Sequence, residues 1–199
     1  MERVLLAAGF ARSAALSWTR PTAELRHIIA ILGRRGLYDV QWGVASPEVV
    51  PILWGRPYRA GDVGDSVMSG TPGTIRHPAA CQSFRLGDAN DATVVGEVST
   101  RIARDMEVVQ KRLTDFGTRR ELRTYLMLNR ERKDRRDFVI PAAFPLKLLT
   151  AAALACVDHD PSTATLVAET ESAMSRFTDE LSLARLARLR SALDELLRA

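Results

Sequence analysis

The chain has 199 residues, of which 46% are hydrophobic and 26% charged, a composition typical of globular proteins that excludes wholesale disorder. Its 28 basic and 24 acidic residues make a mixed surface with a net charge of +4, which does not by itself indicate a nucleic-acid partner. Only Lys111, Lys133 and Lys147 among the basic residues are lysine. This arginine bias is typical of GC-rich bacterial coding, so we do not read it as a functional signal.

The first residues predict a short helix over 1–8, which Gly9 ends because glycine adopts the left-handed cap conformation without steric cost. Apolar residues alternate around Trp18 and again from Leu25 to Ile31, with a turn at Pro21 and Thr22 between the two strands. The clearest strand signal follows, because one face carries Tyr38, Val40, Trp42 and Val44. A fourth strand is expected over 81–86.

Ser46, Pro47 and Glu48 together predict the start of a helix that Pro51 keeps short. The next segment, residues 55–78, holds five glycines and three prolines and is expected to be a long irregular connection. Loops of this length are usually functional or partly disordered, and the sequence does not determine whether this one is ordered.

The second half reads as helices. A long helix capped by Asn90 or Asp91 is predicted from apolar residues spaced by three and four up to Phe116, with Gly117 closing it. Residues 118–121 form a capping box for the next helix. A strongly apolar helix around 144–154 should be buried, and another helix begins at Asp160 and Pro161. The final helical segment has one apolar side that should face inward, formed by Phe177, Leu181, Leu186, Leu189, Leu193 and Leu196.

These elements predict an α+β fold: an antiparallel sheet of about four strands packed on a long helix, followed by a C-terminal helical bundle. We expect residues 1–136 and 137–199 to share one core. The cysteines, Cys81 and Cys156, are interpreted as packed thiols because they lie far apart. The apolar runs are too short for a secretory leader or a bilayer span, so we expect a cytoplasmic protein with no membrane partner.

The order of features resembles the domain of unknown function 4304 family, an uncharacterised group of bacterial proteins. The resemblance rests on Gly9 to Arg12 before the Trp18 strand, Trp42 to Val44 leading to a proline-started helix, the 81–86 strand entering Gly87 and Asp88, and the long helix ending near Leu113. It covers roughly the first 130 residues. It implies an α+β fold in a bacterial cytosolic protein, with no activity or cofactor to carry across.

Two segments are candidate binding surfaces. The first contains Trp54, Arg56, Tyr58 and Arg59, residue types that are enriched at binding hot spots and that open the long loop. Trp54 as a core anchor is the competing interpretation. The second is a basic cluster that could contact phosphates, formed by Arg130, Arg132, Lys133, Arg135 and Arg136. Acidic residues interrupt it, so a solvated helix end with local ion pairs competes there.

No residue is assigned as catalytic or as a metal ligand, and no cofactor is expected. The run Asp158, His159, Asp160 is better explained as a turn with a helix cap than as a metal site, because adjacent residues rarely converge on one ion. His77 with Cys81 or Asp88 is a candidate hydrolase arrangement because these residues flank one predicted strand.

The leading hypothesis is therefore a non-enzymatic protein-binding module of a bacterial cytosolic protein, such as an immunity or regulatory factor, that uses the loop from Trp54 to Pro78. Nucleic-acid binding through the arginine-rich surface is the alternative, and a cryptic hydrolase is the third reading. Whether the chain forms a homo-oligomer through its C-terminal leucines is left open.

Overall fold

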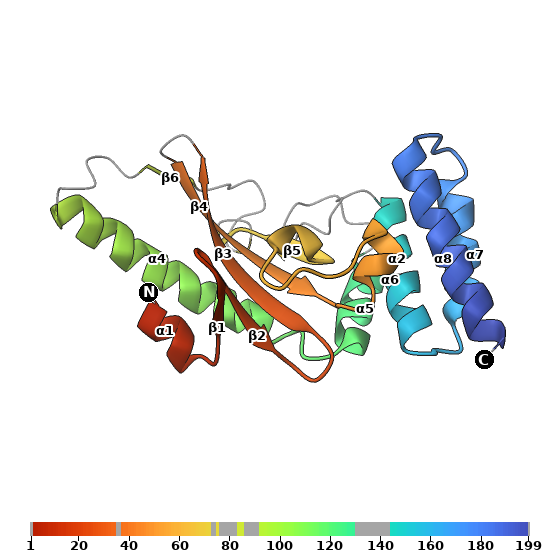
Figure 1. Cartoon of the computed structure of the whole chain (residues 1–199), viewed down its shortest axis with the longest axis horizontal. Helices are drawn as coiled ribbons and strands as arrows, with labels where there is room; N and C mark the ends of the chain where they lie inside the picture. Colours follow the sequence, from red (N-terminus) through yellow and green to blue (C-terminus); the bar gives the residue numbers. More distant parts are fainter. Residues whose placement is uncertain are drawn as a thin grey trace.

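A computed structural model describes residues 2–34, 37–72, 75, 83–85, 92–129 and 144–198. It shows an α+β fold in which a twisted antiparallel sheet lies beside a long helix and a helical bundle stands at one end (Figure 1). The predicted fold class is confirmed. Within the described residues, no helix combines the length and apolar character needed to cross a bilayer.

The sheet begins with a short helix and a hairpin. Helix α1 (Glu2–Ala7) ends before Gly9, which has the predicted positive φ of 80°. Strands β1 (Ala11–Ala14) and β2 (Ser17–Pro21) pair with each other, and β2 pairs with β3 (Arg26–Arg34). Strand β1 was not predicted because its side chains are mostly exposed and lack apolar alternation, as is common at a sheet edge.

Strand β4 (Leu37–Ala45) lies at the centre of the sheet and pairs with β3 along its length. On its other side β4 pairs with β5 (Met68–Gly70) near its end and with β6 (Ser83–Arg85) near its beginning. The sheet thus has more strands than the expected four. Strand β5 escaped prediction because three residues inside a glycine-rich segment carry no periodic signal.

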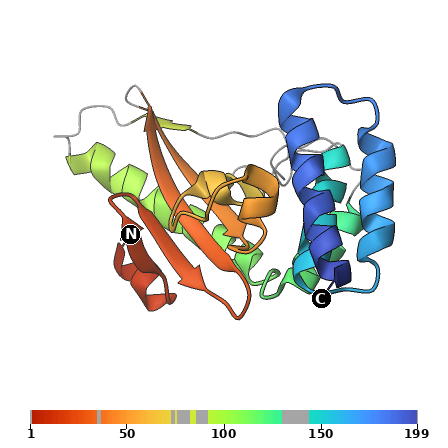
Figure 2. The same cartoon turned by 45° about the vertical axis from the view of Figure 1, so that its right-hand side comes forward.

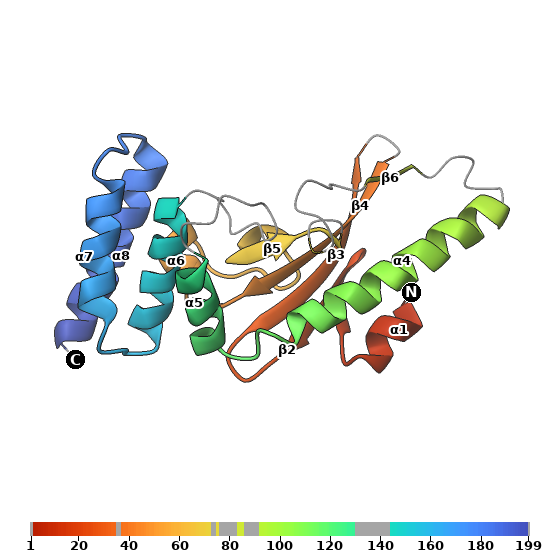
Figure 3. The same ribbon diagram turned by 180° about the vertical axis from the view of Figure 1, so that it is seen from behind.

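Helix α4 (Ala92–Leu113) covers one face of the sheet, as the view from behind shows (Figure 3). This face presents Trp18, Ile29 and Trp42, which are almost fully buried together with Met106 and Val109 of the helix. The aromatic strand predicted from alternating residues is therefore a core strand. Helix α4 ends three residues before Phe116, slightly earlier than expected.

Residues 55–66 pack on the opposite face of the sheet, before the chain enters β5. They contain a 3-10 turn, η1 (Val63–Asp65), whose neighbour Ser66 fits against Gly43 so closely that a side chain on Gly43 would collide with it. The hydroxyl of Ser17 donates to the Gly61 carbonyl at 2.5 Å. Gly61, with φ of 80°, likewise leaves no room for a Cβ beside Ser13. Glycines in this segment thus permit close backbone packing.

Helix α2 (Val50–Trp54) begins later than predicted. Ser46 to Val49 form a turn, Pro51 lies in the first helical turn, and Gly55 rather than the proline ends the helix with a φ of 67°. The first backbone N–H groups of a helix have no partner within the helix. Proline, which lacks this N–H, is therefore tolerated in the first turn.

The helical half starts with α5 (Arg119–Leu128), whose predicted capping box between Thr118 and Glu121 is present. Helices α6 (Phe144–Val157), α7 (Thr163–Met174) and α8 (Glu180–Arg198) form the bundle seen at one end of the molecule (Figure 2). Helix α6 is buried as expected. Helix α7 begins at Thr163 because the Asp160 carboxylate accepts from the Ser162 amide at 2.9 Å in the preceding turn.

The bundle and the sheet half share one hydrophobic core, which includes Trp42 and Leu53 from the first half and Leu154 and Leu189 from the second. Helices α2 and α5 form the contact, since α8 packs on α2 and α6 packs on α5. Leu181 was expected to face inward, but 56% of it is exposed because α8 extends past the end of α2 (Figure 1).

Candidate functional site

Trp54 lies at the C-terminal end of α2, beneath a side chain from the last helix. The guanidinium carbon of Arg185 lies 4.3 Å from the centre of the Trp54 ring, a cation–π contact. Arg185 is only 6% exposed and donates to the Leu53 carbonyl. The Trp54 side chain is half-buried. It therefore acts in part as the core anchor that the sequence suggested and stays partly exposed to solvent.

The end of α2 is capped from outside by two arginines of α8. Arg188 donates to the carbonyls of Ile52 and Leu53, both at 2.9 Å, and Arg185 shares the Leu53 carbonyl at 3.2 Å. The last carbonyls of a helix have no partner within the helix and carry partial negative charge, so cations stabilise them. Burial, with the nearby Arg188 cation, holds the pKa of Arg185 below its usual value.

Arg56 and Arg59 are organised by one buried carboxylate. Asp65 is fully buried, forms an ion pair with Arg56, and accepts a hydrogen bond from the Arg59 backbone amide at 2.6 Å. Asp62 adds a longer ion pair to Arg56, at 3.7 Å, and accepts from the Gly64 amide. The loop from Arg56 to Asp65 is therefore closed on itself by polar contacts.

Tyr58 and Arg59 differ in exposure, because the hydroxyl oxygen of Tyr58 is buried whereas the side chain of Arg59 is exposed. Tyr58 is half-buried, and this burial raises the pKa of its phenol. Arg59 has an exposed side chain that makes no ion pair with any described residue. Of the four predicted partner-binding residues, Arg59 is thus the most accessible, whereas Trp54 and Arg56 also hold the fold together.

The other predicted candidates divide into two groups. The basic cluster of Arg130, Arg132, Lys133, Arg135 and Arg136 lies outside the described residues, as do His77, Cys81 and Asp88. By contrast, the run around His159 is described. Its carboxylates separate: Asp158 pairs with Arg119 at 2.5 Å, and Asp160 pairs with Arg123 at 2.5 Å.

His159 itself lies between these two ion pairs, exposed, with a φ of 52° at the turn that ends α6. Its backbone amide donates to the Cys156 carbonyl, so the residue caps the helix. Throughout the described part of the chain, no three histidine, cysteine, aspartate or glutamate side chains are grouped as metal ligands. The turn interpretation made from the sequence agrees with this geometry.

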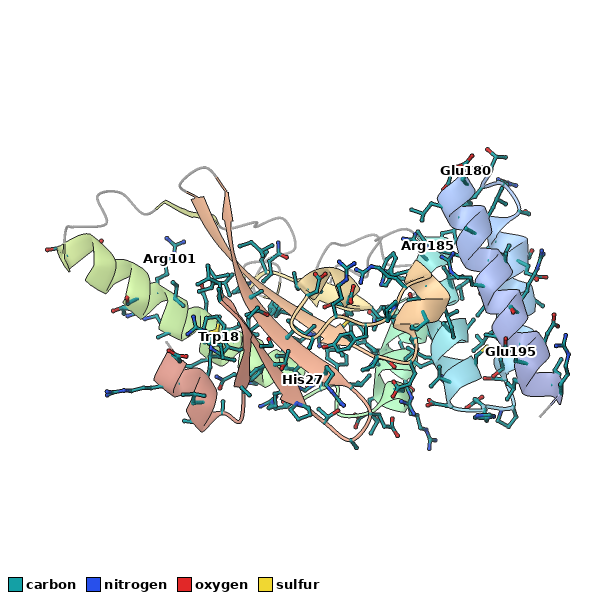
Figure 4. The ribbon with its side chains drawn as sticks, viewed as in Figure 1. Trp18, His27, Arg101, Glu180, Arg185 and Glu195 are labelled. Carbon is teal, nitrogen blue, oxygen red and sulfur yellow. The ribbon has the colours of Figure 1, made fainter. Side chains whose placement is uncertain are left out.

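Sequence reasoning missed Arg185 and Arg188, because nothing in a helical pattern distinguishes a buried capping arginine from an exposed one. It also missed the exposed Leu181, one turn before Arg185 on the same face of α8. Figure 4 places Arg185 where α8 meets the loop after α2. Together the loop residues and Arg185 form a surface, here named the α2–α8 surface: Trp54, Arg56, Tyr58, Arg59 and Arg185.

No family model, curated protein or solved structure matches this chain in comparisons with known proteins. The resemblance to the domain of unknown function 4304 family stays a prediction based on the layout of residues. Function must therefore be argued from the α2–α8 surface itself.

Proposed function

We propose that this chain is a non-enzymatic protein-binding module, and that it binds its partner with the α2–α8 surface. The observation that carries the proposal is the buried Asp65, which fixes Arg56 and the backbone of Arg59 in one arrangement. A loop ordered before binding loses less conformational entropy when a partner arrives.

The side chains on this surface are of the kinds that dominate binding energies. Tryptophan, tyrosine and arginine are enriched at hot spots, and here Trp54 is stacked on Arg185 while Arg59 extends into solvent. A partner with a complementary acidic and aromatic patch would fit this combination, as expected for an immunity or regulatory factor in the bacterial cytosol.

The structure decides which variants test the proposal. Trp54→Ala and Arg56→Ala would remove contacts that support α8 and the loop, so loss of binding in either would be ambiguous. Arg59→Ala changes an exposed side chain, and Tyr58→Ala removes a half-buried ring. Arg3→Ala is the matched control because Arg3 is an exposed arginine of α1, a helix that lies far from α2 and α8 (Figure 1).

A partner is first captured from bacterial cytosol by crosslinking, then purified, and its affinity is measured by calorimetry. We expect Arg59→Ala and Tyr58→Ala each to weaken binding by about tenfold or more, which corresponds to about 1.4 kcal/mol, and Arg3→Ala to have no effect. Equal affinities for all three variants would show that the partner uses another surface. Nucleic-acid binding and hydrolase activity stay predictions from the sequence.

A further inference from the structure

A pocket of about 370 Å³ opens where the start of α2 meets the C-terminal ends of α6 and α8. Its inner wall is apolar and is formed by half-buried Ile52, Val157, Ala192 and Leu196. The thiol of Cys156, only 6% exposed, completes this wall. The volume lies in the range of small-molecule sites.

The rim of the pocket is polar and exposed. It consists of Glu48, Glu195 and His159. Glu48 is shared with Arg119, whose guanidinium lies 3.4 Å from its carboxylate. Glu195, in contrast, has no ion-pair partner among the described residues, which leaves its negative charge available to a ligand.

The backbone adds to this negative potential. Cys156 and Val157 are in the last turn of α6, and Glu195 and Leu196 are in the last turns of α8. The C-terminal ends of helices carry partial negative charge and favour cations. The C-terminal ends of two helices and the carboxylate of Glu195 therefore surround the apolar wall. Their negative potential disfavours the binding of an anion in the pocket.

The thiol does not alter that charge. Burial raises the pKa of Cys156 to about 11, so it stays a neutral thiol at pH 7 and is a poor nucleophile. The arrangement is suited to reversible binding rather than to covalent chemistry.

We propose that this pocket binds a short aliphatic chain that ends in an ammonium or guanidinium group, with the chain against Ile52, Val157 and Leu196 and the cation at Glu195. The site is independent of the α2–α8 surface. Glu195 and Arg185 are ten residues apart on α8, about 15 Å along the helix, and lie toward opposite ends of it (Figure 4).

The test uses the full chain and four probes with a short alkyl chain: n-butylammonium, n-butylguanidinium, butyrate and butyramide. Binding is followed by amide chemical shifts of residues in α2, α6 and α8. We expect both cations to bind and to shift amides around Ile52 and Glu195, with butyrate and butyramide at least about tenfold weaker, a factor that corresponds to about 1.4 kcal/mol.

Three variants locate the site. Glu195→Gln should weaken the cations by about tenfold, whereas Asp194→Asn, which removes the same charge one residue away from the pocket, should change their affinity much less. Ala192→Leu fills the pocket without altering charge and should block binding, with an unchanged circular dichroism spectrum confirming the fold. Equal binding of the cations and butyramide, or no effect of Glu195→Gln, would overturn the proposal.

A blocked pentapeptide with a central arginine is titrated in parallel to identify the natural source of the cation. Tighter binding of the peptide than of n-butylguanidinium would assign the pocket to an arginine side chain of a protein. Binding of the free cations alone would assign it to a small molecule. Failure of all cations would contradict this site and leave the protein-binding proposal untouched, because that proposal concerns Tyr58 and Arg59.

Discussion

His27 shows how one residue can join the sheet to the long helical segment. It is 2% exposed, and its Nε2 lies 2.6 Å from the Phe116 carbonyl, which can only accept. Nε2 therefore carries the proton, and the unprotonated Nδ1 accepts from the guanidinium of Arg20 at 3.0 Å. Both bonds are satisfied only by the neutral ring, since a protonated Nδ1 would face the Arg20 cation.

We expect this histidine to make stability fall as the pH decreases below about 6.5. Burial, followed by the repulsion from Arg20, lowers the pKa of His27, although the bond to Phe116 opposes these effects. The unfolded chain thus binds a proton first as the pH falls, so the contribution is complete above the unfolded pKa of 6.5 and is lost as the pH drops toward the folded value.

Urea unfolding between pH 8 and pH 5 would measure this effect, which cannot exceed about 1.4 kcal/mol per pH unit for one group. A His27→Gln variant should be less stable at pH 8 and should lose much of the pH dependence in this window. His159→Gln is the matched control because His159 is exposed. An unchanged slope in His27→Gln would contradict the assignment.

At the scale of elements, the loop from Arg56 to Asp65 illustrates why a segment without periodic pattern can still be well packed. Its glycines allow close approach to the sheet, and the buried Asp65 binds the Arg56 side chain and the Arg59 backbone amide. A buried carboxylate is costly without partners, so the ion pair with Arg56 and the bond from the Arg59 amide are needed together.

Replacing this carboxylate should loosen the loop. We expect Asp65→Asn to lower the free energy of unfolding by about 2 kcal/mol or more, because Arg56 loses its main counter-ion and a buried polar group loses charge-assisted hydrogen bonds. Urea denaturation measures the change, with exposed Asp194→Asn as the control. Amide exchange in residues 56–66 should accelerate more than in β3, and a loss below about 0.5 kcal/mol would show that the carboxylate does not organise the loop.

At the scale of the whole molecule, the bundle is attached to the sheet half by polar bonds as well as by the shared core. Arg185 and Arg188 of α8 cap α2, and Arg119 and Arg123 of α5 pair with Asp158 and Asp160 in the turn after α6. These contacts join segments far apart in sequence. On this basis we expect residues 1–136 and 137–199 to unfold as one cooperative unit.

We therefore expect a single unfolding transition. All three tryptophans lie in the first half, with Trp18 and Trp42 buried in the sheet core, so their fluorescence reports mainly on the sheet. Far-ultraviolet circular dichroism reports mainly on the helices. The two signals should give the same urea midpoint, and Arg185→Met should shift both midpoints together. A helical transition at a clearly lower urea concentration would show that the bundle unfolds separately.

Acid should weaken the same attachment. Hydrogen bonds from Ser162 and from Arg123 lower the pKa of Asp160 to about 2, from 3.8. The stability that Asp160 contributes is thus present above the unfolded pKa and is lost as the pH falls from 3.8 toward 2. The loss from Asp160 begins near pH 3.8, below the pH of 6.5 at which the loss from His27 begins.

Local patterns in the sequence determined the elements whose stabilising contacts are close in the chain. The alternation around Trp42, the capping box at Thr118 and the Gly9 stop all appeared as predicted, because each depends on neighbours within a few residues. The α+β class followed from these elements. The same reasoning selected Trp54, Arg56, Tyr58 and Arg59 by residue type alone.

Tertiary structure decided what those residues contact. Contacts between distant segments, which no periodic pattern encodes, decide three features. They place Arg185 on Trp54, pair Asp65 with Arg56, and pack residues 55–66 on the second face of the sheet. The same holds for β5, which forms by pairing with β4, and for the pocket at Glu195, which forms where α2, α6 and α8 meet. Contacts between residues that are close in sequence can be predicted from local patterns. Contacts between distant segments form only when the whole chain folds, because bringing such segments together costs loop entropy that no local pattern reports.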